Sequence, residues 1–385
     1  MIKRVLQQKI TQEIGRGKVI ILLGPRQVGK TTLVETILDD LSVEYTYYSG
    51  DDPTVDGLFR DKGREELREL ARGNRIVFVD EAQRIRDIGL RLKLLVDNYP
   101  DIQFIVTGSS SLDLARGVNE PLTGRKYQHY LYPISYAEYA GEVGRSIARQ
   151  NLPDRLVYGF YPEVILAEGA GRSTLQLIAE SYLYKDILAL EDIRKPDLLT
   201  NLLQALALQV GSEVSYNELA KLLRVDAQTV ERYVALLEQA FVIFRLRALA
   251  RNPRKEISRG RKVYFWDNGI RNALLNNFEP MTRRTDRGAL WENFIVSERL
   301  KAQQYHDRYG SSYFWRNYDQ AEVDYVEVYD GRHLAYKIKW NPRRKGQVPR
   351  AFLNAYERSE GKVITPSNFE AFLLVQGATK EELPE

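Results

Sequence analysis

The sequence predicts an α/β protein with an N-terminal parallel sheet, a helical middle domain and a second α/β domain at the C-terminal end. Two stretches near the N-terminus carry most of this prediction. Residues 19–23 are continuously apolar and end at a glycine, and residues 76–79 are apolar and end at two carboxylates. Short apolar runs without polar alternation are typical of strands buried on both faces of a parallel sheet.

The composition limits the class of protein. At 385 residues the chain has room for two or three domains, and its lack of cysteine excludes disulfides, thiolate metal sites and a cysteine nucleophile. No apolar run reaches the roughly 18 residues that would cross a membrane, and the first residues lack the apolar core of a signal peptide. We therefore expect a globular cytoplasmic protein without a membrane partner.

The stretch that follows the first apolar run has the spacing of a phosphate-binding loop. Its candidate nucleotide-binding residues are Gly24, Pro25, Arg26, Gln27, Val28, Gly29, Lys30, Thr31 and Thr32. Glycines let the backbone wrap closely around phosphates, and N–H groups at the start of the next helix point at the anion. Lys30 would neutralise the β- and γ-phosphates, and the Thr31 hydroxyl would hold Mg²⁺. The motif predicts ATP and Mg²⁺ as cofactors.

The two acids after the second apolar run complete this site. A buried strand would carry Asp80 to the carboxyl end of the sheet, where it can support the metal. Glu81, one residue further, would activate the attacking water. The pair follows the phosphate loop by about 50 residues, a spacing that strengthens the assignment.

Two further residues are candidates for catalysis. The strand near residues 102–106 ends in hydroxyl side chains, of which Ser109 is our choice for sensing loss of the γ-phosphate, with Thr107 and Ser110 as alternatives. Arg125 precedes a fifth strand at 127–131. Its guanidinium could stabilise transition-state charge, most plausibly at the site of a neighbouring subunit, although a solvated surface arginine fits the sequence equally well.

These motifs resemble a prokaryotic AAA-type (AAA+) P-loop ATPase family that carries a C-terminal domain of unknown function. The resemblance rests on residues 24–32, 80–83, 107–110 and 124–135, with further marks at 159–164, 182–187, 262–269 and 291–293. It covers nearly the whole chain. The resemblance implies the strand order of additional-strand P-loop ATPases and assembly into an oligomeric, hexameric ring.

Residues 199–262 read as a winged helix-turn-helix domain. Ser215 and Glu218 form a capping box for a second helix that ends at Leu223, and a third helix runs from about Asp226 to Gln239 before a strand. The side chains expected to face outward on this recognition helix are Gln228, Thr229, Glu231 and Arg232. Because winged helices also serve as protein–protein adaptors, a protein partner remains an alternative to nucleic acid.

A run of basic residues in the predicted wing favours nucleic acid. The run comprises Arg245, Arg247, Arg251, Arg254, Lys255, Arg259, Arg261 and Lys262, and Glu256 alone opposes it. Such a local concentration of cations suits contact with phosphate backbones.

The last part of the chain resembles the PD-(D/E)XK nuclease fold. In that fold a helix acid, a strand Asp and a Glu-x-Lys pair hold a metal and activate water; Glu292, Asp324 and Lys339 match three of these positions. The fourth falls on Lys337, a cation that cannot coordinate Mg²⁺. We therefore expect a nuclease-like domain whose catalytic site is lost.

The expected domains are the ATPase domain at 1–145, a helical linker region at 146–198, the winged helix at 199–262 and the nuclease-like domain at 263–385. The order of an ATPase and a winged helix is similar to that of Holliday-junction branch-migration motors. The predicted function is ATP-driven remodelling or translocation of DNA, including branched DNA. The alternatives are an ATP-dependent switch that acts on protein partners through the winged helix, and an ATP-coupled nuclease.

Overall fold

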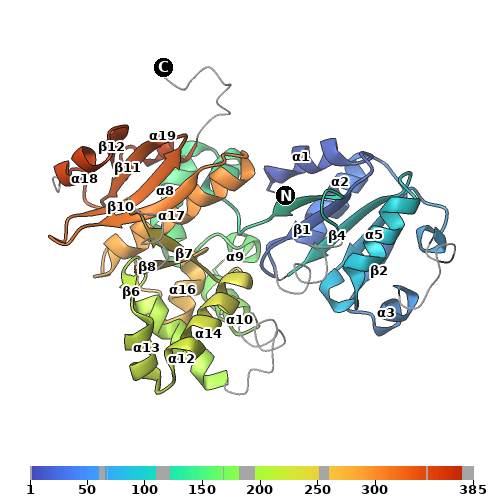
Figure 1. Cartoon of the computed structure of the whole chain (residues 1–385), viewed down its shortest axis with the longest axis horizontal. Coiled ribbons are helices and arrows are strands. Elements are labelled where there is room, and N and C mark those ends of the chain that lie inside the picture. Colours follow the sequence, from blue (N-terminus) through green and yellow to red (C-terminus); the bar gives the residue numbers. More distant parts are fainter. Residues whose placement is uncertain are drawn as a thin grey trace. The chain divides into compact units, whose positions relative to one another are not determined.

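The computed structural model of the chain describes residues 2–59, 66, 68–109, 122–167, 169–181, 196–250, 260–343 and 346–374. The chain forms two compact units, the first mainly from residues 1–134 and the second mainly from residues 135–180, 195–238 and 242–385 (Figure 1). None of the described helices is both long and apolar enough to cross a membrane. The mixed α/β fold class predicted from the sequence is confirmed.

The first unit is built around a five-stranded sheet with the order β2-β3-β4-β1-β5. Its elements are α1 (Leu6–Glu13), β1 (Val19–Leu23), α2 (Lys30–Asp40), β2 (Thr46–Ser49), α3 (Pro53–Phe59), the 3₁₀ turn η1 (Glu69–Ala71), β3 (Ile76–Asp80), the 3₁₀ turn η2 (Ala82–Arg84), α5 (Ile88–Asn98), β4 (Gln103–Gly108) and β5 (Lys126–Tyr130). All strand pairs are parallel, and β1, β3 and β4 are buried along their whole length. Strand β4 lies between β1 and β3, which is the order expected from the resemblance to additional-strand P-loop ATPases.

The register of these strands brings three polar segments together. Leu23 is paired with Gly108, and Val79 is paired with Val106. The carboxyl ends of β1, β3 and β4 therefore lie at one edge of the sheet. Ligands of open parallel sheets bind outside this edge. Helices α2 and α5 pack against β4 and support the edge (Figure 1).

A buried arginine at the start of the chain fixes the backbone near this edge. The Arg4 guanidinium donates from Nη1 to the carbonyl oxygen of Val28 at 2.8 Å and from Nη2 to that of Tyr132 at 2.6 Å. Val28 belongs to the phosphate loop, and Tyr132 follows β5. Arg4 therefore holds the phosphate loop and the segment after β5 in one arrangement.

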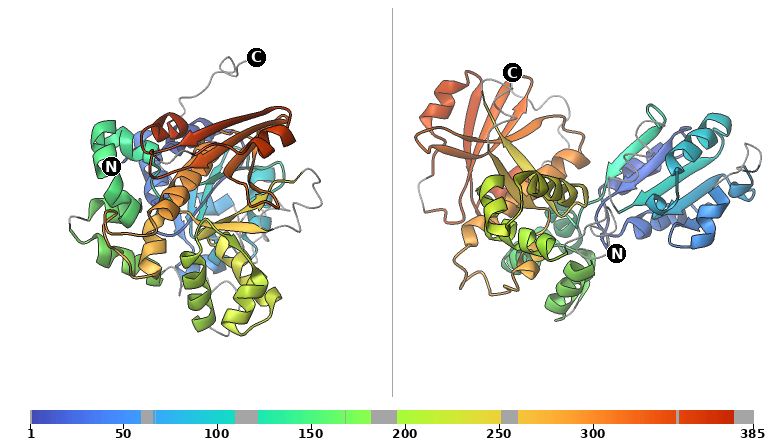
Figure 2. Two further views of the ribbon diagram at one scale, coloured as in Figure 1. Left: turned by 90° about the vertical axis from the view of Figure 1, so that its left-hand side faces the viewer. Right: turned by 60° about the horizontal axis from the view of Figure 1, so that its bottom comes forward.

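The second unit contains a seven-stranded sheet with the order β12-β11-β10-β9-β7-β8-β6. Its elements are α7 (Tyr136–Val143), α8 (Arg145–Tyr158), α9 (Pro162–Leu166), α10 (Gly171–Ser181), α12 (Pro196–Leu208), β6 (Glu213–Val214), α13 (Tyr216–Leu223), α14 (Ala227–Gln239), β7 (Ile243–Ala248), β8 (Arg261–Phe265), α16 (Asn268–Leu274), α17 (Arg287–Tyr305), β9 (Ser311–Arg316), β10 (Glu322–Tyr329), β11 (Arg332–Ile338), α18 (Arg350–Ala355), β12 (Ser359–Ile364) and α19 (Phe369–Leu373). The long helix α17 packs against β8 and β11 (Figure 2). The expected boundary between residues 262 and 263 falls within β8.

The segment from α12 to β8 has the order helix, short strand, helix, helix and two-stranded hairpin. The Ser215 side chain accepts a hydrogen bond from the N–H of Glu218 and so caps α13, which ends at Arg224 in the left-handed conformation. Asp226 starts α14 by accepting hydrogen bonds from the backbone and hydroxyl of Thr229 at 2.7 and 2.8 Å. The side chains of Ser215, which was predicted as a cap, and of Asp226, which was not, thus set the two helix starts.

Several of the segments on which the family resemblance rests pack against one another in the second unit. The Asp267 carboxylate accepts a hydrogen bond from the N–H of Phe160 at 2.7 Å, and a Cβ on Gly159 would lie 2.0 Å from it. The Asn293 side chain bonds the backbone of Phe265 on β8. These marks therefore hold α8, β8 and α17 together. The mark at 182–187 lies outside the described residues.

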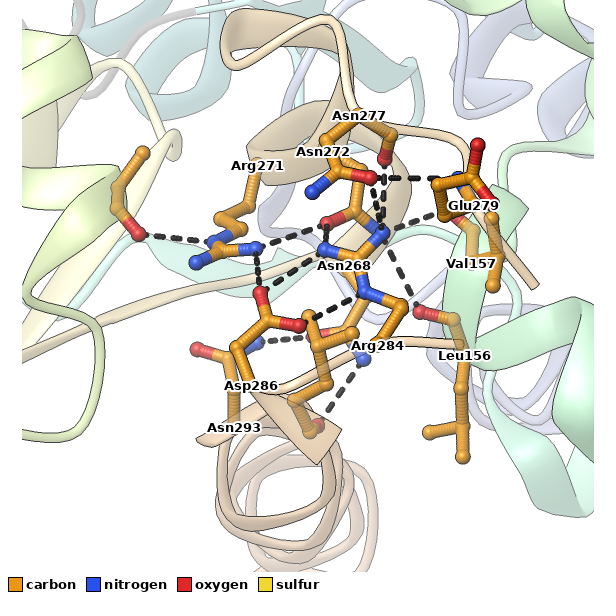
Figure 3. A network of polar contacts seen from close by, with 12 residues as sticks. Leu156, Val157, Asn268, Arg271, Asn272, Asn277, Glu279, Arg284, Asp286 and Asn293 are labelled. Carbon is orange, nitrogen blue, oxygen red and sulfur yellow. Dashed lines mark hydrogen bonds and ion pairs between the residues drawn. The ribbon is translucent and has the colours of Figure 1, made fainter. Parts of the chain in front are cut away.

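A second polar network fixes the end of α16 (Figure 3). Arg284 donates to both carboxylate oxygens of Asp286, at 2.8 and 2.9 Å, and Arg271 donates to the same carboxylate at 2.6 Å. Asn272 bonds both arginines and also donates to the carbonyl oxygen of Val157 at 2.8 Å, at the end of α8. Burial by itself would raise the pKa of Asp286, but the hydrogen bonds and charges of Arg284 and Arg271 lower it to about 2.

This network predicts a pH-dependent contribution to stability. The low folded-state pKa of Asp286 stabilises the protein fully above about pH 4, and this stabilisation is lost as the pH falls towards 2. We expect Asp286→Asn to lower the free energy of unfolding by about 2 kcal/mol at pH 7. Urea unfolding of both proteins across this range should show the difference shrinking as the pH falls; a difference that is constant with pH would contradict this account.

Candidate nucleotide-binding site

The predicted phosphate loop lies between β1 and α2. Gly29 precedes α2 in the left-handed conformation, with φ 88°, and its carbonyl oxygen accepts the N–H of Leu33 at 2.9 Å. A Cβ on Gly24 would lie 2.0 Å from the carbonyl oxygen of Leu131. Both glycines are therefore required by the backbone path of the loop.

Lys30 is buried inside this loop. Its ammonium group donates to the carbonyl oxygens of Gly24 at 2.9 Å and Pro25 at 2.8 Å. The charge is thus held at the concave side of the loop, beside the N-terminus of α2. This arrangement of an ammonium, a helix N-terminus and a tight loop fits a polyphosphate.

Asp80 at the end of β3 contacts the first turn of α2. The Thr31 hydroxyl donates to one Asp80 carboxylate oxygen at 2.8 Å, and the Thr107 hydroxyl donates to the other. The Tyr47 hydroxyl also lies 3.5 Å from the first oxygen. Hydroxyl and carboxylate oxygens are the ligands that Mg²⁺ prefers, so Thr31 and Asp80 fit a magnesium ion bound with a nucleotide.

Glu81 lies beside Asp80 in a constrained backbone conformation. Its φ and ψ are 48° and 42°, in the left-handed region, and its N–H donates to the Thr107 hydroxyl at 3.2 Å. A Cβ on Gly50 would lie 2.3 Å from the Glu81 carbonyl oxygen, so the end of β2 packs directly on this turn. The Glu81 main chain is thereby fixed directly after β3, at the same edge of the sheet as Lys30.

The structure places the sensor candidates at the end of β4. Thr107 is fully buried and bonds Asp80, as described above, while Ser109 is buried and accepts a hydrogen bond from Gln83 at 2.9 Å. Ser110 lies outside the described residues. The structure therefore brings both Ser109 and Thr107 to the edge that holds Glu81.

Arg125 lies at the opposite edge of the sheet. Its carbonyl oxygen accepts the N–H of Val19, the first residue of β1, and its guanidinium donates to Asp97 at 2.5 Å. The phosphate loop follows the other end of β1, about 16 Å away at ~3.3 Å per residue. Arg125 therefore does not meet the nucleotide site of its own chain.

Two residues that contact the candidate catalytic residues were not among those predicted from the sequence. Tyr47 reaches Asp80 from β2, and Gln83 links Glu81 to Ser109 through its amide. A tyrosine within a strand and a glutamine after two acids have no distinctive spacing. Only the strand order and the turn after β3 bring them to the site.

The acids of the nuclease-like region are paired with lysines. Lys262 on β8 contacts Glu292 at 3.2 Å and Glu322 at 2.7 Å, while Lys337 contacts Asp324 at 2.5 Å. Burial alone would lower the pKa of Lys262, but the surrounding carboxylates raise it above its ordinary value. Ammonium groups thus lie directly beside Glu292 and Asp324, two of the acids that the sequence analysis compared with nuclease metal ligands. Lys339, partly exposed, bonds Ile364 through its backbone N–H.

The described part of the basic run is largely neutralised within the protein. Arg245 forms hydrogen bonds with Glu238 and Tyr216, Arg261 lies 3.4 Å from Glu231, and Lys262 is buried as above. Arg247 is exposed. The other members, Arg251, Arg254, Lys255 and Arg259, lie outside the described residues.

Three family models match the chain. Residues 16–140 match an AAA domain, residues 149–280 match a domain of unknown function (DUF8612), and residues 287–380 match another domain of unknown function (DUF4143).

Relatives over most of the chain are uncharacterized proteins. The chain is 29% identical over 345 residues to one from Mycobacterium tuberculosis, covering 88% of this chain and 74% of the relative. It is 25% identical over 333 residues to one from Methanocaldococcus jannaschii, covering 76% of this chain and 70% of the relative.

Solved structures with detectable similarity include RuvB of Thermotoga maritima, described as a Holliday junction branch migration motor. It is 20% identical with a TM-score of 0.30, covering 72% of this chain and 96% of that chain. A variant of the same protein gives a TM-score of 0.35 at 18% identity, with the same coverage. TM-scores this low do not establish a common arrangement of the whole chain. The family match shows that residues 16–140 form an AAA domain, which contains the phosphate loop and the acids at the end of β3, in a chain that also matches a C-terminal domain of unknown function.

Proposed function

We propose that the chain hydrolyses ATP with Mg²⁺ at the carboxyl edge of the first sheet. The contact between the Thr31 hydroxyl and the Asp80 carboxylate carries this proposal, because it joins the phosphate loop to the predicted metal-supporting acid. Lys30 would exchange its two carbonyl partners for phosphate oxygens. Thr31 and Asp80 would hold Mg²⁺, which neutralises charge on the phosphates.

In the hydrolytic step, water attacks the γ-phosphorus and the bond to the bridging oxygen of ADP breaks. Glu81 accepts the proton that the water loses. Ser109, buried at the end of β4, is the proposed sensor of γ-phosphate release. Phosphate release from ATP by the purified full chain tests this proposal, and an absence of Mg²⁺-dependent release would overturn it.

We further propose that an oligomeric ring is the active form and that Arg125 acts at a neighbouring subunit. Its place at the edge opposite the phosphate loop supports this assignment, because the residue lies far from the site of its own chain. The Asp97 contact would then have to open, which is compatible with the partial exposure of both side chains.

We also propose that ATP turnover acts on DNA, by remodelling or translocation, through the segment from α12 to β8 as a winged helix. Contact with phosphates is assigned to the exposed Arg247 and to the four basic residues at 251–259, rather than to α14. Thr229 is occupied by its cap contact, and Glu231 is an exposed anion on that helix. This division predicts contact with phosphates without sequence readout.

The competing proposal is an ATP-dependent switch that acts on a protein partner through the same segment. The pairing of Arg245, Arg261 and Lys262 with carboxylates favours this alternative, because it removes three cations from the expected phosphate-binding surface. An ATP-coupled nuclease would need a metal beside Glu292 and Asp324, where Lys262 and Lys337 lie.

The DNA proposal predicts that duplex, single-stranded or four-way-junction DNA stimulates ATP hydrolysis, with an apparent affinity that falls steeply as salt increases. Replacing Arg251 and Arg254 by Gln should reduce the slope of log affinity against log salt by about 2. The matched variant Arg232→Gln, an exposed cation on α14, should leave the slope unchanged. Turnover that no form of DNA alters would contradict the proposal and favour the switch.

A further inference from the structure

Gln83 makes two contacts through a single amide nitrogen. Its Nε2 donates to the Glu81 carboxylate at 2.5 Å and to the Ser109 hydroxyl at 2.9 Å. An ionised carboxylate only accepts hydrogen bonds, so the NH₂ side of the amide must face Glu81. The amide thus connects the proposed base with the proposed sensor.

The backbone contacts around Glu81 do not involve its carboxylate, which is held by Gln83. Turn η2 is closed by the N–H of Arg84, which bonds the Glu81 carbonyl oxygen at 3.1 Å, while Gly50 and Thr107 fix the peptide groups on either side. These contacts fix the Glu81 main chain alone. Gln83, two residues along the same turn, therefore sets the direction of the carboxylate.

The other end of the amide is available to a further donor. The Gln83 Oε1 atom is buried and has no hydrogen-bond partner among the described residues. A buried acceptor without a hydrogen bond is unfavourable, so a donor is expected there when the site is filled. The attacking water has two O–H groups. Glu81 takes the proton of one, and the other can donate a hydrogen bond.

We infer that Gln83 is a positioning residue for ATP hydrolysis: its NH₂ group aligns Glu81 with Ser109, and its carbonyl oxygen accepts a hydrogen bond from the O–H group that the attacking water keeps. The inference rests on the proposed ATPase function and adds a residue to it. Gln83 therefore contributes to turnover and does not contribute to nucleotide binding.

The first test separates turnover from binding. Gln83→Met removes both polar ends at nearly constant size and is expected to lower kcat about 100-fold, while the Kd for ATP stays within about twofold of wild type. Gln7→Met is the matched control, because Gln7 bonds the exposed Asp40 at the C-terminal end of α2, whereas the phosphate loop precedes its N-terminal end. It should leave kcat unchanged. The unfolding midpoint of each variant shows that it is folded.

The second test uses a variant of the same shape. In Gln83→Glu the side chain keeps its size but ends in a carboxylate, which accepts hydrogen bonds and cannot donate one to Glu81. Gln83→Glu is therefore expected to lower kcat about 100-fold with the Kd for ATP within about twofold of wild type, and it carries the test if Gln83→Met does not fold.

The outcomes are separable. If the wild-type chain hydrolyses ATP and both variants turn over within about twofold of it, the role of Gln83 is overturned and the ATPase proposal stands. If the wild-type chain itself shows no Mg²⁺-dependent hydrolysis, the proposed function fails and the inference fails with it. A reduced kcat accompanied by an equally weakened ATP affinity would also overturn the positioning role.

Discussion

Glu81→Gln is expected to bind ATP with wild-type affinity and to hydrolyse it at least about 100-fold more slowly. The amide has the size of the carboxylate but cannot accept the proton that the attacking water loses. The residues that hold the nucleotide, Lys30 and Thr31, are unchanged, and Lys30 is held by carbonyl oxygens of the loop, which this substitution leaves in place. Titration with a fluorescent nucleotide and phosphate release measure binding and turnover separately.

The matched control for this variant is Glu142→Gln, which changes an exposed glutamate on α7. It should match wild type in both measurements. If Glu81→Gln retained more than about a tenth of wild-type turnover, a base outside the described turn would have to accept the proton, and the role of Glu81 would be wrong.

Lys262→Met is expected to destabilise the second unit by about 3–5 kcal/mol. The ammonium group contacts Glu292 and Glu322, and its removal leaves two partly buried carboxylates without this counter-charge. Burial already raises the pKa of Glu292, which the charge of Lys262 opposes. Without Lys262 this pKa rises further. Glu292 is therefore protonated more readily as the pH falls, and a neutral carboxyl group no longer needs the missing counter-charge. Urea unfolding at pH 7 and at pH 5 should show the larger loss at pH 7.

An exposed ion pair in the same sheet provides the comparison. Arg332 contacts Glu360 at 2.8 Å, and both side chains are open to solvent, so Arg332→Met should cost less than about 1 kcal/mol. A loss for Lys262→Met as small as that of the control would show that the carboxylates around Lys262 are solvated, contrary to the structure.

The residues of the candidate nucleotide site could be assembled from the sequence because their signals are local. The glycines, Lys30 and Thr31 follow a buried strand within a few residues, and Asp80 and Glu81 end another. A parallel sheet necessarily brings such strand ends to one edge. The contacts of Tyr47 and Gln83 depend on strand order and on one turn, which no local spacing specifies.

Lys262 shows why the second unit was harder to predict. In the sequence it ends a run of cations and reads as part of a solvated, phosphate-binding surface. In the structure it lies on β8, where its side chain faces the interior and meets carboxylates from α17 and β10. The parallel pairing of β7 with β9, at Arg247 and Tyr313, joins the predicted wing to the nuclease-like strands in one sheet. Pairing between segments so far apart in sequence leaves no local pattern.

The most direct measurement of the central proposal is phosphate release from ATP by the purified full chain and by Thr31→Val, each with Mg²⁺ and with EDTA. Valine keeps the shape of threonine but removes the hydroxyl that bonds Asp80 at 2.8 Å. The account predicts release by the wild-type chain that requires Mg²⁺ and falls about 100-fold in the variant. Release that is independent of Mg²⁺, or equal in the two proteins, would contradict it.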